Sequence, residues 1–270
     1  MKRTEGSRTA LRGFTILELL VSICVLAILV LIMAQIVGMV SDTWRAGKTR
    51  VDNFAQARLA LGMLDRDVRS GVFLPGLGAF VNADGTGGAC ALYTRMPGSE
   101  GDRKLSLVEY AMSGTTTPGL VRSDYGLDYS TSSRTLSFGS GDKLPDLGKA
   151  EAQEIARGVF AFAWQFIDGG GQVTDSFSSD PDHPANTATT KALVVSLAVL
   201  DEDALRLADE TGTLALLTAR TAGTPLSGGI FADFWSDRVL DAGFLETLPQ
   251  PVRRGVRFFK RVIPIPVERS

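Results

Sequence analysis

The chain has 270 residues, of which 44% are hydrophobic and 21% are charged, and its formal net charge at pH 7 is -2. A chain of this length can bury a large hydrophobic core, and its acidic balance argues against a nucleic-acid-binding protein. With one histidine and two cysteines, the sequence excludes an HExxH zinc motif and a Cys/His metal cluster, and it contains no Walker A pattern.

The N-terminal part of the chain is a basic segment followed by a long apolar one. Between residues 14 and 41, the only side chain charged at neutral pH is Glu18. A helix rises about 1.5 Å per residue, so this segment can cross the roughly 30 Å hydrocarbon core of a bilayer. Four basic residues precede it and none follows before Arg45, which predicts a cytoplasmic N-terminus and an exported remainder. The four are Lys2, Arg3, Arg8 and Arg12.

Glu18 is unusual in such a segment. Two ordinary interpretations of the segment are a signal anchor that is retained and a secretory signal that is removed. A carboxylate inside an apolar membrane segment is costly unless it has a partner, and such a residue is a functional hypothesis in itself. We therefore expect Glu18 to have a partner.

Residues 13–18 read Gly-Phe-Thr-Ile-Leu-Glu and stand between the basic leader and the apolar run. This arrangement resembles the N-terminal signature of type IV pilins and type II secretion pseudopilins. The resemblance implies that a prepilin peptidase cuts after Gly13 and N-methylates Phe14. It also implies that Glu18 pairs with the Phe14 amine of a neighbouring subunit in a filament. Loss of the leader takes four positive charges and one negative charge from a net -2, which leaves -5.

The helix is expected to continue beyond the apolar run. Apolar residues at spacings of three and four indicate one helical face that holds the exported sheet. These residues are Phe54, Ala57, Leu61, Leu64 and Val68. Gly71 and the Pro-Gly pair at 75–76 are stop signals. We therefore predict one helix over residues 14–72, with flexing at Gly38 and Gly47.

Strand-like runs follow a stretch at residues 74–88 that is rich in glycine and is predicted to be a loop. The predicted strands are residues 89–94, 105–111, 119–122, 134–138, 159–167, 192–200 and 256–263. In the clearest of them, four aromatic residues alternate with smaller ones, which predicts that all four lie on one face. The four are Phe160, Phe162, Trp164 and Phe166.

The order of these elements predicts an α+β fold. A long N-terminal transmembrane helix would pack on an antiparallel β-sheet, which is the pilin-like arrangement that the resemblance implies. Residues 154–200 resemble, more loosely, the C-terminal sheet of the J-type minor pseudopilin, whereas residues 201–248 depart from it and predict a helical insertion. The predicted domains are a leader at 1–13, a transmembrane helix at 14–40, a periplasmic extension at 41–73 and an exported β-rich domain at 74–270.

The remaining polar candidates favour a structural protein over an enzyme. His183 stands in a proline-containing polar segment, where a solvated loop residue is a simpler interpretation than a catalytic or metal-binding one. Calcium is a candidate cofactor because related pseudopilins can carry it, and two acidic groups could supply oxygen ligands. They are Asp175, Asp180 and Asp182, and Asp201, Glu202 and Asp203. Neither group has EF-hand spacing, so we expect solvated charges rather than a metal site.

Two functions follow from the sequence. The first is a minor pseudopilin of a type II secretion or type IV pilus-like filament, anchored in the bacterial inner membrane with a periplasmic C-terminal domain. The apolar run contains no proline and the chain is long, and both features favour a minor subunit over a major one. Its partners would be prepilin peptidase and other pilin-like subunits. The alternative is a membrane-anchored periplasmic binding or enzymatic domain with an ordinary signal anchor.

Overall fold

The structure is a computed structural model that describes residues 15–73, 80–81, 89–96, 105–113, 117–130, 135–138, 152–177, 186, 188–226 and 228–266. The chain divides into two compact units, Met1–Lys48 and Thr49–Ser270, and each is described here by itself. The predicted cleavage site, Gly13 and Phe14, lies outside the described residues, as do His183, Asp180 and Asp182.

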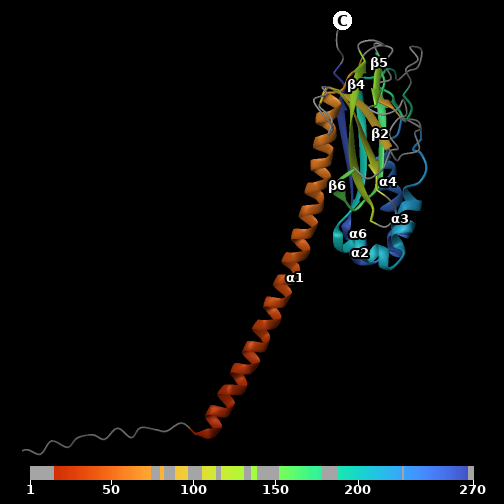
Figure 1. Ribbon diagram of the computed structural model, residues 1–270. Coiled ribbons are helices and arrows are strands. Elements are labelled where there is room, and N and C mark those ends of the chain that lie inside the picture. The colour runs from red at the N-terminus through yellow and green to blue at the C-terminus, as the bar shows by residue number, and fades with distance from the viewer. Residues whose placement is uncertain are drawn as a thin grey trace, which may run out of the picture. The chain divides into compact units, whose positions relative to one another are not determined.

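Helix α1 (Ile16–Arg69) begins the described part of the chain and has 54 residues (Figure 1). It is helical throughout, including Gly38 and Gly47, where flexing was expected. Its segment Ile16–Ser41 has a mean hydropathy of 3.1, and its residues are all exposed rather than buried. Among the described helices, this one is long and apolar enough to cross a membrane. The predicted helix of residues 14–72 is therefore confirmed within a few residues at its C-terminal end.

The N-terminal sheet follows α1 and consists of antiparallel strands in the order β1-β2-β3-β4-β5, with β6 also paired to β4. Its strands are β1 (Phe80–Val81), β2 (Ala89–Thr94), β3 (Ser106–Met112), β4 (Gly119–Ser130), β5 (Thr135–Phe138) and β6 (Gln153–Arg157). The expected strand at residues 89–94 is confirmed with its bounds. Strand β4 is much longer than the four residues predicted, and β1 and β6 were not predicted.

The C-terminal sheet is also antiparallel, in the order β10-β9-β7-β8. Its strands are β7 (Val159–Ile167), β8 (Val173–Thr174), β9 (Ala192–Leu200) and β10 (Val256–Pro264). The described strands thus form two sheets where one was predicted. Gly158 separates β6 from β7 with a φ of 71°, and a Cβ at this position would overlap the carbonyl oxygen of Leu200. Glycine is required here because the left-handed backbone and the close approach both exclude a side chain.

The expectation for the aromatic strand is wrong at one residue. Phe162, Trp164 and Phe166 lie in the core shared with α1, but Phe160 lies with Ala161 and Ala163 on the opposite face. The cause is an irregularity in the pairing of β7 with β9 between Val159 and Ala161. An extra residue in one strand shifts the alternation by one, so residues on the two sides of it face opposite ways.

The C-terminal part of α1 supplies the core of the second unit. A stripe of apolar side chains packs with the inner faces of both sheets, which confirms the predicted helix-on-sheet packing. The helical contributors are Ala57, Ala60, Leu61, Leu64 and Val68, each at most 6% exposed. Phe54 is half-buried and contacts Phe259 of β10 at a ring-centroid distance of 6.0 Å. This stripe holds the helix on the sheets through the removal of apolar surface from water.

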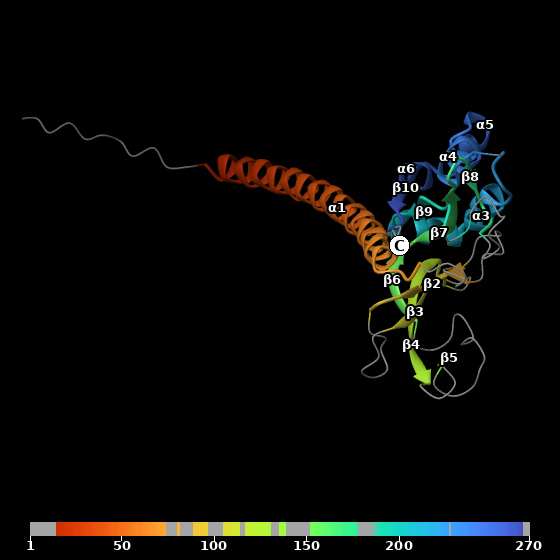
Figure 2. The same ribbon diagram turned by 90° about the horizontal axis from the view of Figure 1, so that it is seen from above.

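Five short helices cover the other face of the C-terminal sheet, on the side away from β2, β3 and β4 (Figure 2). They are α2 (Glu202–Glu210), α3 (Thr213–Thr221), α4 (Phe231–Val239), α5 (Ala242–Thr247) and α6 (Gln250–Gly255). The predicted insertion at residues 201–248 is confirmed as helical, and the helical part extends to Gly255.

Side chains of the C-terminal sheet hold the beginning of α4, which has no side-chain cap of its own. The Oε1 atom of Gln165 accepts a hydrogen bond from the Phe231 amide at 3.1 Å, and its Nε2 atom donates to the carbonyl oxygen of Gly229 at 2.9 Å. The hydroxyl of Ser196 accepts from the Ala232 amide at 3.1 Å. Because the first amides of a helix have no partner within it, these contacts satisfy groups that would otherwise be buried unpaired.

Candidate functional site

The described chain begins at the N-terminus of α1 with two side chains that bond to each other's backbone. Thr15 Oγ1 accepts a hydrogen bond from the Glu18 amide at 3.2 Å. Glu18 Oε2 accepts from the Thr15 amide at 3.4 Å and from the Thr15 hydroxyl at 3.3 Å. This reciprocal arrangement is a capping box, which satisfies free amides at the start of a helix. The sequence carries a signal of this cap, Thr-x-x-Glu at residues 15–18, which the expectations above did not include.

The capping box places the carboxylate of Glu18 in an exposed position on the first turn of α1. An anion is favoured there because the free amides and the helix dipole give this end a partial positive charge. No hydrogen bond to the second carboxylate oxygen, Oε1, occurs within the described residues. The expected partner is the Phe14 amine of a neighbouring subunit, and Phe14 lies outside the described residues, so this pairing stays a prediction.

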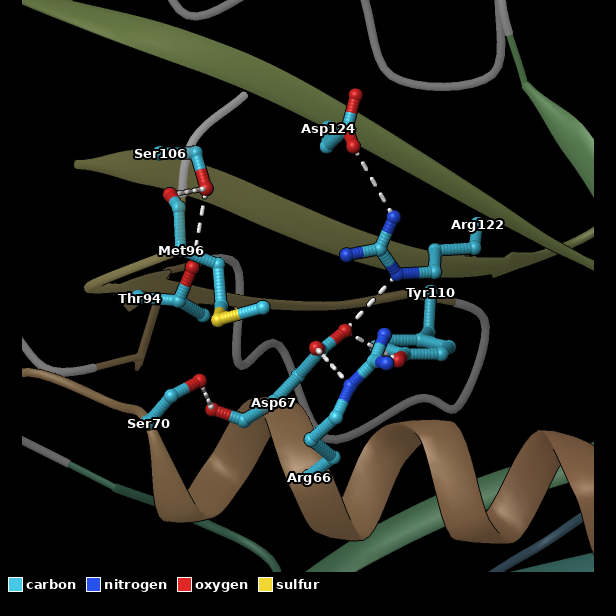
Figure 3. A network of polar contacts seen from close by, with 9 residues as sticks. All are labelled: Arg66, Asp67, Ser70, Thr94, Met96, Ser106, Tyr110, Arg122 and Asp124. Atoms are coloured by element: carbon cyan, nitrogen blue, oxygen red, sulfur yellow. Dashed lines mark hydrogen bonds and ion pairs between the residues drawn. The ribbon is translucent and has the colours of Figure 1, made fainter. Parts of the chain in front are cut away.

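A second polar cluster lies at the other end of α1, within the compact unit Thr49–Ser270. Asp67 is fully buried and points from α1 toward the N-terminal sheet (Figure 3). Its Oδ2 atom accepts a 2.6 Å hydrogen bond from the Tyr110 hydroxyl and a 2.8 Å bond from Arg122 Nε. Arg122 also donates to Asp124 at 3.1 Å, and Arg66 Nε lies 3.9 Å from Asp67 Oδ1. The cluster therefore joins the last turns of α1 to β3 and β4.

The electrostatics of this cluster favour its charged and bonded form. Burial, and then the neighbouring Asp67, raise the pKa of Tyr110 well above its usual range, so the phenol stays a donor. Burial alone would lower the pKa of Arg122, but the hydrogen bond and charge of Asp67 raise it above its ordinary value. A buried ion pair with these partners is costly to break because one charge is then left uncompensated. The arrangement fits a rigid connection rather than proton transfer.

Glu109 is the neighbour of Tyr110 on β3 and faces the opposite side of the sheet. It is 1% exposed, and neither carboxylate oxygen has a hydrogen-bond partner among the residues that the structure describes. Its cross-strand neighbours are Ala91 and Ser123. Burial raises the pKa of Glu109 from 4.5 to about 7. The ionised form is therefore disfavoured relative to that of a solvated carboxylate, and Glu109 changes its charge close to neutral pH.

The acidic residues proposed for calcium do not come together in the described part of the chain. Asp201 caps helix α2, where its side chain accepts a 2.8 Å hydrogen bond from the Ala204 amide. Glu202 and Asp203 follow it as exposed residues in the first turn, where negative charge is favoured. Asp175 is half-buried, and within the described residues no group of three His, Cys, Asp or Glu side chains could hold a metal ion.

No model of a known protein family matches the chain.

Proposed function

We propose that this protein is a minor pilin-like structural subunit, a pseudopilin of a type II secretion or type IV pilus-like filament. The observation that supports it most is Glu18 at the first turn of an apolar helix, Ile16–Ser41, whose side chains are all exposed. An exposed apolar surface of this size needs lipid or other apolar helices around it. In a structural subunit that passes from a bilayer into a bundle of helices, lipid covers this surface first and other apolar helices cover it afterwards.

The proposed assembly step follows from the charges at the start of the helix. Cleavage after Gly13 creates an amine on Phe14, next to a membrane segment that carries one carboxylate. Each charge alone is costly near hydrocarbon, and pairing between neighbouring subunits compensates both. The capping box uses Oε2 of Glu18, which leaves Oε1 for an incoming amine. Assembly can therefore proceed without loss of the helix cap.

The second unit has the arrangement that such a subunit requires. The same helix that carries Glu18 ends in the core of the unit Thr49–Ser270, where the apolar stripe and Asp67 hold it on the sheets. In this proposal the protein is a substrate of prepilin peptidase and is not itself an enzyme. It lies in the bacterial inner membrane with a cytoplasmic N-terminus and a periplasmic domain, and its partners are other pilin-like subunits.

The test uses incorporation into the filament. Glu18→Ala and Glu18→Gln are expected to be processed like the wild type but to lose most of their cross-linking to other pilin-like subunits, because the neutral side chain no longer attracts the amine. Asp42→Asn is the matched control, since Asp42 is an acid just past the other end of the apolar segment. Normal incorporation of both Glu18 variants would contradict the proposed pairing.

A further inference from the structure

We propose that Trp44 lies in the lipid headgroup layer on the exported side of the membrane and fixes the depth of α1. Trp44 is 75% exposed, whereas the other tryptophans in the chain, Trp164 and Trp235, are 4% and 3% exposed. It lies three residues beyond Ser41, the last residue of the apolar segment. The inference rests on the membrane anchoring proposed above and does not require prepilin processing.

The length of the helix supports this placement. Glu18 and Trp44 are 26 residues apart, which corresponds to about 39 Å along a helix axis. At an ordinary tilt of about 20°, this is about 37 Å along the bilayer normal. The hydrocarbon core is about 30 Å thick, and the bilayer with its headgroups about 40–45 Å. With Glu18 at one edge of the hydrocarbon, Trp44 therefore falls about 7 Å beyond the opposite edge, in a headgroup layer that is about 5–7.5 Å thick.

The chemistry of the adjoining residues also fits the headgroup layer. An indole ring is apolar with one N–H donor, and the interface offers both apolar chains and lipid carbonyl or phosphate acceptors. Arg45 and Lys48 follow Trp44 in the sequence, and Asp42 is the single acid among residues 42–48. Cationic side chains at this depth are attracted to lipid phosphates. Among the described residues, no ring contact or hydrogen bond gives Trp44 a different partner, in agreement with its 75% exposure.

The experiment uses the full chain in phospholipid nanodiscs that contain lipids brominated either near the headgroup or near the end of the acyl chain. The fluorescence of Trp44 is obtained as the difference between the wild type and Trp44→Phe. Two further probes are made in the Trp44→Phe background. Ile32→Trp reports the middle of the apolar segment, and Leu59→Trp reports an exposed site of the globular unit, 62% exposed in the wild type.

We expect Trp44 to lose more fluorescence with the shallow bromine than with the deep one, whereas the Ile32→Trp probe shows the reverse and the Leu59→Trp probe responds to neither. If the Ile32→Trp probe is quenched but Trp44 behaves like the Leu59→Trp probe, the depth assignment is wrong while the membrane anchor stands. Stronger quenching of Trp44 by the deep bromine also overturns it. If the Ile32→Trp probe is not quenched either, the anchoring proposal itself fails.

Discussion

The hydroxyl of Tyr110 donates a 2.6 Å hydrogen bond to the fully buried carboxylate of Asp67. This contact joins the last turns of a 54-residue helix to the third strand of the N-terminal sheet. Arg122 donates to the same oxygen, Oδ2, at 2.8 Å and compensates the charge of the carboxylate, whereas Oδ1 has no hydrogen-bond partner within the described residues. The cluster therefore fixes the C-terminal end of α1 to β3 and β4.

Substitutions in this cluster should be strongly destabilising. Tyr110→Phe removes one hydrogen bond to a charged group, which we expect to lower the free energy of unfolding by about 1.5–3 kcal/mol. Asp67→Ala leaves Arg122, whose side chain is 13% exposed, without its main partner, and should cost about 3–5 kcal/mol. Denaturant unfolding of the detergent-solubilised full chain measures both values.

Arg69→Gln provides the control for these substitutions. Arg69 pairs with Asp65 on the same helix at 3.1 Å, but its side chain is 58% exposed. A surface pair of this kind contributes at most about 1 kcal/mol. A similar loss of stability for Arg69→Gln and Asp67→Ala would show that the buried cluster has no special role.

Glu109 should make the stability of the folded unit depend on pH. Its folded pKa is raised from 4.5 to about 7, so the folded state binds the proton more tightly than the unfolded state. Its contribution is therefore fully present below pH 4.5 and is lost as the pH rises through about 7. The total change is about 3 kcal/mol. Unfolding curves of the wild type and Glu109→Gln across this range isolate the contribution of this residue.

The free energy of unfolding of Glu109→Gln should stay near its low-pH value as the pH rises from 5 to 8. The free energy of unfolding of the wild type should fall over the same range. The amide cannot ionise, so the desolvation cost of a buried anion disappears. A wild type and variant that show the same pH dependence would mean that Glu109 ionises in the folded state as easily as in water.

Gly158→Ala should destabilise the connection between the two sheets. A Cβ at Gly158 meets the backbone of Leu200, and the φ of 71° is itself unfavourable for alanine. Gly212 is a matched control because its φ is 70° and a Cβ there meets nothing within 4 Å. Gly212→Ala should cost about 1 kcal/mol from backbone strain alone. Gly158→Ala should cost clearly more in thermal unfolding, and equal losses would exclude the steric contribution.

Thr15 should control the order of the first turn of α1. Thr15→Val keeps the shape of the side chain but removes the oxygen that accepts from the Glu18 amide. Loss of an N-cap costs about 1 kcal/mol, which corresponds to a roughly fivefold faster amide exchange at this turn. Thr15→Ser retains the oxygen and should exchange like the wild type. Hydrogen exchange of the full chain in nanodiscs compares the three proteins. Equal exchange rates for the wild type, Thr15→Val and Thr15→Ser would contradict the role of Thr15 as a cap.

Much of the fold was predictable because its signals are local. The apolar stripe of α1 and the runs at β2, β7, β9 and β10 have the periodicity of their own element. The second half of β4 had a local signal that the prediction missed, because Tyr125, Leu127 and Tyr129 alternate at period two. Strand β6 was not predictable in this way, because it is mostly polar and only its pairing with β4 makes it a strand. The irregularity before Ala161 likewise depends on the pairing with Ala198 and Val199 of β9.

In the polar clusters, too, some features have a local sequence signal and others depend on residues far away in the sequence. Asp67 comes three residues after Leu64, on the apolar side of the helix, so its position was a local signal of a buried charge. Its partners Tyr110 and Arg122 come from strands 43 and 55 residues away, and no local pattern connects them. Glu109 appeared in a partly alternating strand where one polar residue is expected to be solvated, and only the structure shows that it is buried.

The mass of the mature N-terminus tests the central claim most directly. The chain is expressed with a prepilin peptidase, purified from the membrane and analysed intact and after proteolysis. A pilin-like subunit predicts a chain that begins at Phe14 with one methyl group on its amine. A chain that still begins at Met1, or one cut after about Leu29 by an ordinary signal peptidase, would contradict the assignment.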